Sequence, residues 1–204
     1  MAASDDDHNL ELSAARLIAE VALAEERAGE SLVELRKALV RLEEHVRPTI
    51  RAQARLVEAR LLAQSGDIAA ATEIAVELLA DAQRSRDRLG GAVALAQLGY
   101  LSLDGGDYDV AADRFTQAAE LFREVRDQRG LSWSLLGAAD AELHRRRNRA
   151  GLAALNEALQ IWSVTGEASR EYIARLQRIR GLLRPSDRPQ LLDSEITRLS
   201  TATS

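Results

Sequence analysis

Apolar residues recur along most of this chain with the spacing of amphipathic α-helices, and the pattern repeats every 40 residues. The motif Ser65–Asp67 returns as Gly105–Asp107, and a column of small and large apolar residues follows each copy. After the second copy this column is Ala111, Phe115 and Ala118. Small residues let two helix backbones approach closely, and the larger residue fills the groove beside them. The recurrence therefore predicts tandem pairs of packed helices.

The repeat predicts an all-α chain of four to five helix pairs, closed by a C-terminal capping helix. We expect a disordered acidic tail over 1–9, a helical-repeat domain over 10–184, and a capping helix with its tail over 185–204. The first helices of the pairs are expected over about 10–26, 49–65, 88–104, 129–146 and 167–183. The second helices are expected over about 29–46, 67–86, 107–127 and 148–164, and the cap over 191–199.

The turns inside the pairs carry their own signals. Gly66 and Gly106 end first helices, where glycine accepts a left-handed conformation, and the aspartate after each glycine suits a helix N-cap. Arg146 and Arg147 replace this Gly-Asp pair in the next repeat, which leaves the geometry of that turn open.

A family resemblance follows from these positions. Leu98, Gly99, the Gly106–Tyr108 turn and the column after it resemble the tetratricopeptide repeat signature. The long period and the run from 118 to 137 are similar to the long-helix variety found in kinesin light chain and in sensor regions of bacterial NB-ARC-type regulators. The resemblance covers about residues 12–183. It implies a right-handed superhelical solenoid of TPR-like pairs, in which the first helices line a concave groove that holds a peptide or protein.

Composition narrows the classes of function. The chain has no cysteine, and no apolar run approaches the length that spans a bilayer, so a cytoplasmic protein without a membrane partner is expected. The net charge is −5, with 16 basic against 25 acidic residues up to Asp140 and 11 against 7 after it. An acidic total argues against a nucleic-acid partner. Lys37 is the only lysine among 27 basic residues, which is typical of high-GC codon usage; the alternative is selection of arginine for bidentate carboxylate binding.

Residues with catalytic or metal-binding chemistry are scattered. His8, His45 and His144 lie far apart, and no pair has the spacing of a helical metal site, so neither a metal nor a cofactor is expected. The sequence has no nucleophile elbow and no phosphate-binding loop, and we do not expect an enzyme. The arginine cluster over 145–149 is interpreted as an exposed loop between paired helices that could dock an acidic partner. The alternative is a nucleic-acid or anion site, which is disfavoured because no aromatic residues interleave the arginines.

The first helices carry the candidate binding residues. Tyr100 and Trp133 stand out because aromatic residues are only 3% of the chain and hot spots favour tyrosine, tryptophan and arginine. Trp133 has a second interpretation, as a packing residue between repeats, whereas Trp162 is expected in the core. The predicted groove consists of Arg16, Gln53, Arg60, Gln64, Tyr100, Asp104, Trp133, Asp140, His144 and Arg180.

Three functional hypotheses follow. The first is a scaffold or adaptor that binds a protein or peptide in the groove, with Tyr100, Trp133 and Arg60 on one surface. The second is a small-molecule binder or small enzyme with a pocket around Tyr100, Asp140 and His144, and an enclosed pocket there would favour it. The third is a homo-oligomer, because the basic end could stack on the acidic remainder.

Overall fold

The computed structural model describes residues 4–25, 27–42, 45–165 and 170–202, and these residues form ten α-helices and one short 3-10 helix, with no strand. The helices are α1 (Asp5–Ala24), α2 (Ala28–Leu42), α3 (Pro48–Gln64), α4 (Ile68–Ser85), α5 (Arg88–Asp104), α6 (Tyr108–Glu124), α7 (Gln128–His144), α8 (Asn148–Thr165), α9 (Arg170–Leu182), the 3-10 helix η1 (Pro185–Asp187) and α10 (Gln190–Ala202). Within the described ranges, no helix combines the length and apolar character needed to cross a bilayer.

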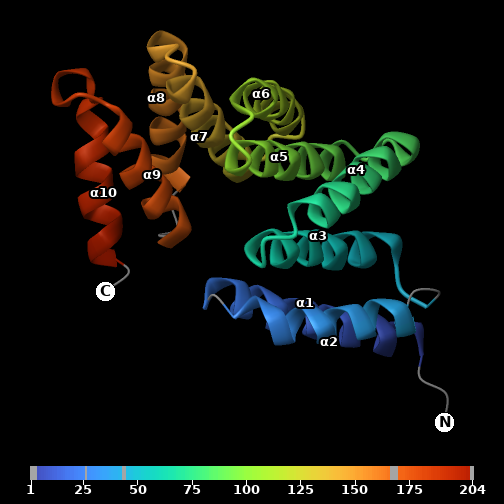
Figure 1. Ribbon diagram of the computed structural model, residues 1–204. Helices are drawn as coiled ribbons and strands as arrows, with labels where there is room; N and C mark the ends of the chain where they lie inside the picture. Colours follow the sequence, from blue (N-terminus) through green and yellow to red (C-terminus); the bar gives the residue numbers. More distant parts are fainter. Residues whose placement is uncertain (1–3, 26, 43–44, 166–169, 203–204) are drawn as a thin grey trace. The chain divides into compact units, whose positions relative to one another are not determined.

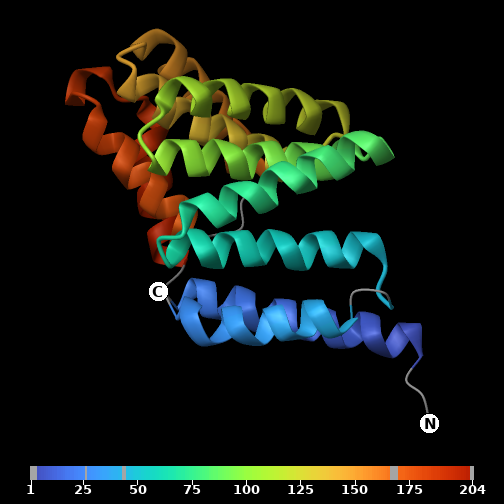
Figure 2. The ribbon, with the colours of Figure 1, turned by 45° about the vertical axis from the view of Figure 1, so that its right-hand side comes forward.

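The helices belong to two compact units, Met1–Ser85 with α1 to α4 and Arg86–Ser204 with α5 to α10 (Figure 1). In the first unit, α1 packs against α2 and α3, and α3 packs against α2 and α4 (Figure 2). In the second unit, α5, α7 and α9 are successive neighbours, while α6 packs against α5 and α7, and α8 against α7 and α10. Consecutive helices therefore pack as pairs, which confirms the predicted all-α repeat architecture.

The turns between helices recur every 20 residues with one backbone geometry. In each turn the residue two positions before the next helix has a positive φ: Gly66 (90°), Arg86 (57°), Gly106 (81°), Arg126 (59°) and Arg146 (59°). Three turns thus place arginine in a left-handed conformation that glycine adopts more easily. The turn whose geometry the sequence left open is built like the others.

The next residue in four of these turns is an aspartate that caps the following helix. Asp67 accepts a hydrogen bond from the Ala70 amide, and Asp87, Asp107 and Asp127 accept from the amides of residues 90, 110 and 130. Each cap satisfies one of the amides that a helix N-terminus leaves without a partner.

The column of small residues is buried, as the repeat predicted. Ala111, Phe115 and Ala118 are each 0% exposed. The close approach is visible at Gly137 of α7, where an added Cβ would lie 2.4 Å from Cζ of Phe115 in α6. Because that distance is far below any real contact, the α6–α7 crossing depends on glycine at this position.

The first helix begins earlier than the sequence indicated. Residues 5–9, expected in a disordered tail, form the first turns of α1. Ser4 caps the helix by accepting from the Asp7 amide, and the Asp7 carboxylate accepts from the Ser4 amide. The acidic run was interpreted as a solvated tail, whereas three aspartates in a first turn also stabilise a helix through its dipole.

Candidate functional site

The second unit brings polar and aromatic residues of three first helices to one face. We call the side of α5, α7 and α9 that carries Tyr100, Trp133, His144, Arg175 and Arg178 the first-helix face. The three helices are neighbours in the unit (Figure 1). Residues far apart in sequence therefore share one surface.

Contacts of Tyr100 and Arg175 connect the three helices of this face. The Tyr100 hydroxyl donates a hydrogen bond of 3.0 Å to the main-chain oxygen of Trp133, which ties α5 to α7. The guanidinium carbon of Arg175 in α9 lies 3.9 Å from the centre of the Tyr100 ring, a cation–π contact. Burial raises the pKa of Tyr100 above its ordinary value, so the hydroxyl keeps its proton and remains a donor.

Asp140 is a buried carboxylate at the centre of the face, with 1% of its side chain exposed. His144 Nδ1 lies 3.1 Å from Asp140 Oδ1, and Arg178 Nε lies 3.4 Å from Oδ2. The same Nδ1 is closer to the Asp140 main-chain oxygen, at 2.9 Å, and neither carboxylate oxygen has a well-aligned hydrogen bond from the described residues. Burial raises the pKa of Asp140, and the nearby Arg178 and His144 oppose that rise.

Aromatic residues of α7, α8 and α9 pack against one another beside this face. Trp133 is half-buried, and its ring meets the Tyr172 ring edge-on at 5.1 Å between centroids, while Tyr172 stacks on Trp162 at 3.9 Å. Trp162 is 2% exposed, as expected for a core residue. Trp133 thus takes part in packing and keeps part of its ring exposed.

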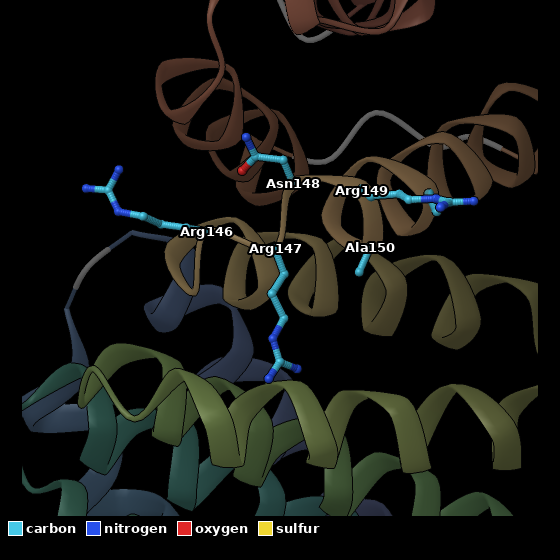
Figure 3. A pocket seen from close by; sticks show the side chains of 6 residues that line it. Arg146, Arg147, Asn148, Arg149 and Ala150 are labelled. Atoms are coloured by element: carbon cyan, nitrogen blue, oxygen red, sulfur yellow. The ribbon is translucent and has the colours of Figure 1, made fainter.

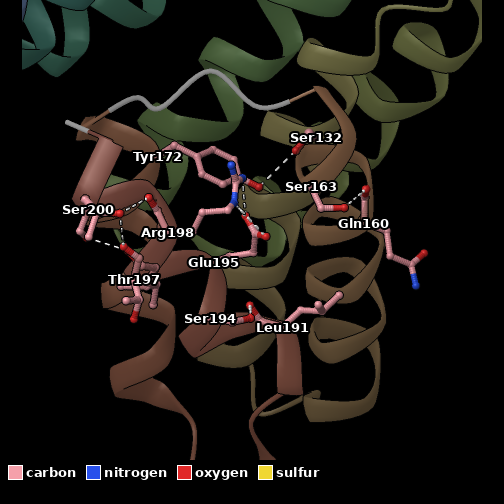
Figure 4. A network of polar contacts seen from close by, with 12 residues as sticks. Ser132, Gln160, Ser163, Tyr172, Leu191, Ser194, Glu195, Thr197, Arg198 and Ser200 are labelled. Atoms are coloured by element: carbon pink, nitrogen blue, oxygen red, sulfur yellow. Dashed lines mark hydrogen bonds and ion pairs between the residues drawn. The ribbon is translucent and has the colours of Figure 1, made fainter.

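A polar network holds this aromatic stack in place (Figure 4). Ser132 Oγ donates to the main-chain oxygen of Ala158, so the Tyr172 hydroxyl, at 3.2 Å, donates to Ser132. Burial raises the pKa of Tyr172 to about 12. In α10, Arg198 forms a forked ion pair of 2.6 Å and 3.1 Å with the buried carboxylate of Glu195.

The remaining predicted groove residues divide between the units. Arg16, Gln53, Arg60 and Gln64 belong to the first unit, where Arg16 pairs with Glu20 at 2.6 Å. Gln64 donates to the main-chain oxygen of Leu23. Arg60 belongs to a different unit from Tyr100 and Trp133, so a surface shared by all three stays a prediction.

Two predicted residues lie at the margin of the second unit. Asp104 is exposed at the C-terminal end of α5, and Arg180 Nη1 lies 3.5 Å from Asp193 of α10. Arg175 and Arg178 are not among the predicted groove residues, although the repeat pattern carries a signal for them. At the 40-residue period, Arg175 stands in the column of Leu95 and Leu135, and an arginine in an apolar column marks an exception to the packing pattern.

The arginine cluster forms a different surface, around the turn between α7 and α8. Arg146, Arg147, Asn148, Arg149 and Ala150 surround a shallow hollow with Ala153. Figure 3 shows the side chains of Arg146, Arg147 and Arg149 pointing in different directions. They do not converge on one point as a bidentate anion site would require.

Two residues of the predicted small-molecule pocket already contact other groups of the unit. A second surface hollow, lined by Asp5, Asp6, Asn9, His45, Val46 and Arg47, lies in the first unit, away from Tyr100, Asp140 and His144. The His144 ring stacks on Tyr108 at 4.4 Å, and the Tyr100 hydroxyl is already bonded to Trp133. No group of three or more potential metal ligands occurs among the described residues.

Comparison with known proteins identifies the fold. No protein-family model and no curated protein matches the sequence. Among solved structures, a kinesin light chain-type protein of Podosopora anserina with nearly identical TPR-like repeats is similar at a TM-score of 0.67 and 14% identity, over 97% of this chain and 99% of that one. A point variant of the same protein gives a TM-score of 0.68 at 14% identity, over 96% and 97%.

A second kind of protein shares the architecture. The apo form of RapI is similar at a TM-score of 0.72 and 17% identity, over 96% of this chain and 54% of RapI. The chain therefore spans about half the length of RapI. Helix pairs, positive-φ turns and a buried small-residue column agree with these likenesses, and the chain has the fold of tetratricopeptide-like repeat proteins.

Proposed function

We propose that the chain is a protein-interaction module whose first-helix face binds a peptide or a segment of a protein partner. One observation carries the proposal: Tyr100, Trp133 and Arg178, three residue types that dominate binding hot spots, come to one face from three helices. Tyrosine and tryptophan are scarce in this sequence, which has three of the former and two of the latter. A surface enriched in scarce hot-spot residues is typical of a binding site.

The exposed charges of the face favour a ligand that has charged groups as well as an apolar one. Arg178 is 43% exposed, and its partner Asp140 is buried, so the arginine has donors left for a ligand. Glu171, within 3.9 Å of Arg175, adds an acceptor at the edge of the face. A peptide with an apolar anchor beside Trp133 and a carboxylate near Arg178 would match this arrangement.

The test begins with selection of binding peptides from a random display library on the intact chain. Affinity for a selected peptide is then measured by fluorescence anisotropy for Arg178→Ala and for Arg123→Ala. Arg123 is the matched control because it is 47% exposed, ion-paired to Glu157, and located on α6 rather than on the face. We expect Arg178→Ala to weaken binding about tenfold, the effect of a modest hot spot, and Arg123→Ala to leave it within about twofold.

One outcome of these affinity measurements would contradict the proposal. If selected peptides bind Arg178→Ala and Trp133→Ala as well as the unchanged chain, the first-helix face is not the binding surface. Both variants are compared only after circular dichroism shows that helical content is kept, because the Trp133 ring packs on Tyr172 and Arg178 is the partner of the buried Asp140.

A further inference from the structure

The first unit exposes an apolar stripe on α1. Leu10, Leu17 and Val21 are 69%, 53% and 56% exposed, and Ala14 lies between them on the same side. These residues are spaced by four, three and four positions, the heptad pattern of a seam between two helices. The opposite side of α1 buries Leu12 and packs on α2 and α3, so the helix is apolar on two sides.

The equivalent face of the next first helix shows what such a stripe contacts. Forty residues on, Ala14, Leu17 and Val21 correspond to Ala54, Val57 and Leu61 of α3, which are 0%, 2% and 0% exposed. They share a core cluster with Leu35, Ala38 and Leu42 of α2 and with Leu12 and Ala19 of α1. In α3, therefore, this face is covered by the helices of the preceding pair, and α2 contributes a row of three apolar residues to it.

The second unit repeats the arrangement independently. Gly137 and Ala141 of α7 stand in the same columns as Leu17 and Val21 of α1. Gly137 closely approaches the Phe115 ring of α6, and Ala141 packs in one cluster with it. Across the residues that the structure describes, α1 receives no such helix, and Ile18 is 66% exposed. The stripe therefore has the composition and spacing of a helix-stacking surface.

Charge indicates what kind of helix would fit. The residues that flank the stripe on the α1 surface are acidic or neutral, and the helix as a whole carries Asp5, Asp6, Asp7, Glu11 and Glu20 against the single Arg16. The flanking acids make exposed ion pairs within the unit, such as Glu11 with Arg41 and Asp6 with Arg47. Exposed pairs of this kind are weak and exchange readily with a partner's charges.

We infer that α1 is a second interaction surface, which binds an amphipathic helix of a partner protein with an apolar seam and basic flanks. The seam would take the place that Leu35, Ala38 and Leu42 of α2 occupy on α3. A second copy of α1 is disfavoured as the occupant, because its acidic flanks would oppose those already present. The surface lies in the first unit, whereas the first-helix face consists of residues of the second.

The test uses two designed helical peptides of about three heptads, both with leucine and alanine at the seam positions. One carries lysine at the flanking positions and the other glutamate. Binding to the intact chain is measured by fluorescence anisotropy at two salt concentrations. We expect the lysine peptide to bind at least about tenfold tighter than the glutamate peptide, with an advantage that shrinks in high salt.

Variants of the chain locate the binding. Leu17→Lys and Leu10→Lys place a like charge in the stripe and should each weaken the lysine peptide by about tenfold or more. Val40→Lys is the matched control, because Val40 is an apolar residue 79% exposed on α2 and outside the stripe. It should change the affinity by less than about twofold. All three replace exposed residues, so circular dichroism should show unchanged helical content.

Two results would overturn the inference. The first is equal affinity for the two peptides, or an equal loss with Val40→Lys, either of which means that α1 does not select a basic helix. The second is a dimer in light scattering that Leu17→Lys returns to monomer, because the occupant would then be a second copy of the chain.

Discussion

Arg147 interrupts the series of helix caps, and replacing it with aspartate should stabilise the second unit. Asp67, Asp87, Asp107 and Asp127 each cap the helix that follows at 20-residue intervals, and Arg147 occupies the next position, directly before α8. An arginine side chain cannot accept a hydrogen bond from the helix amides. Its positive charge also opposes the positive end of the α8 dipole.

The backbone at Arg147 already has the geometry of a capped turn. The Arg147 amide donates to the Glu142 carbonyl at 2.9 Å, as the Asp127 amide donates to the Phe122 carbonyl at 3.0 Å. The Arg147 carbonyl accepts from the Gly151 amide at 3.0 Å, as the Asp127 carbonyl accepts from residue 131 at 3.0 Å. An aspartate at 147 can therefore reach the Ala150 amide without a change of backbone.

Three substitutions separate the effects of the cap and the charge. Arg147→Ala removes only the unfavourable charge and should stabilise by about 0.3–1 kcal/mol. Arg147→Asn adds a capping acceptor, worth about 1 kcal/mol more. Arg147→Asp adds the favourable negative charge as well, for a total of about 1–3 kcal/mol. Asp127→Ala provides the reverse control and should cost about 1 kcal/mol.

Tryptophan fluorescence during urea unfolding is the appropriate assay, because both tryptophans of the chain, Trp133 and Trp162, lie in the second unit. The signal therefore reports the unit that contains the mutated turn. Equal free energies of unfolding for Arg147→Asn and Arg147→Ala, with the expected loss for Asp127→Ala, would contradict a cap at residue 147. In that case the turn before α8 does not share the geometry of the other four.

Three further predictions concern the same unit. Ala118→Leu should destabilise it by about 1–3 kcal/mol in urea unfolding, because the fully buried Ala118 lies at a close helix crossing, and a change below about 0.5 kcal/mol would contradict the packing. Arg146→Gly should stabilise it by about 0.5–1 kcal/mol, since the left-handed strain of about 1–2 kcal/mol exceeds the entropy cost of glycine. Burial raises the pKa of Asp140, so this group binds its proton more tightly in the folded state. Its contribution to the free energy of unfolding should therefore fall as the pH rises above 3.8 towards the raised folded pKa. Asp140→Asn should remove this contribution to the pH dependence of the free energy of unfolding.

The fold could be predicted from the sequence because its rules are local and repeated. Each repeated signal has a single structural explanation: glycine at 66 and 106 and the aspartate after each form a turn, and the small residues at 111 and 118 form a close helix crossing. The 40-residue period repeats these signals along the chain. The start of α1 was missed because a run of aspartates fits both a solvated tail and a dipole-stabilised first turn. Composition alone does not separate the two.

The candidate site was only partly predictable, because contacts between helices depend on side-chain reach. Tyr100 and Trp133 were identified from their rarity and position, but their link runs from the Tyr100 hydroxyl to a main-chain oxygen, which no side-chain pattern encodes. Arg175 contacts the Tyr100 ring from two first helices away, at a sequence distance of 75 residues, and a repeat pattern gives no information at that range.

Residues that break the repeat pattern provide the clearest route to function. A packed repeat is most stable with apolar residues in its columns, so polar exceptions that lower stability tend to occur where a site needs them. Arg178 is such an exception, because the same column holds Leu98 and Ala138. The same column accepts the small Ala138, but Arg178 Nε also lies 3.4 Å from the buried Asp140 carboxylate, and Arg178→Ala leaves that charge without this partner. Trp133→Ala in turn removes the ring contact with Tyr172. Asp140→Asn removes the buried charge, so Arg178→Ala measured in that background separates loss of binding from loss of folding.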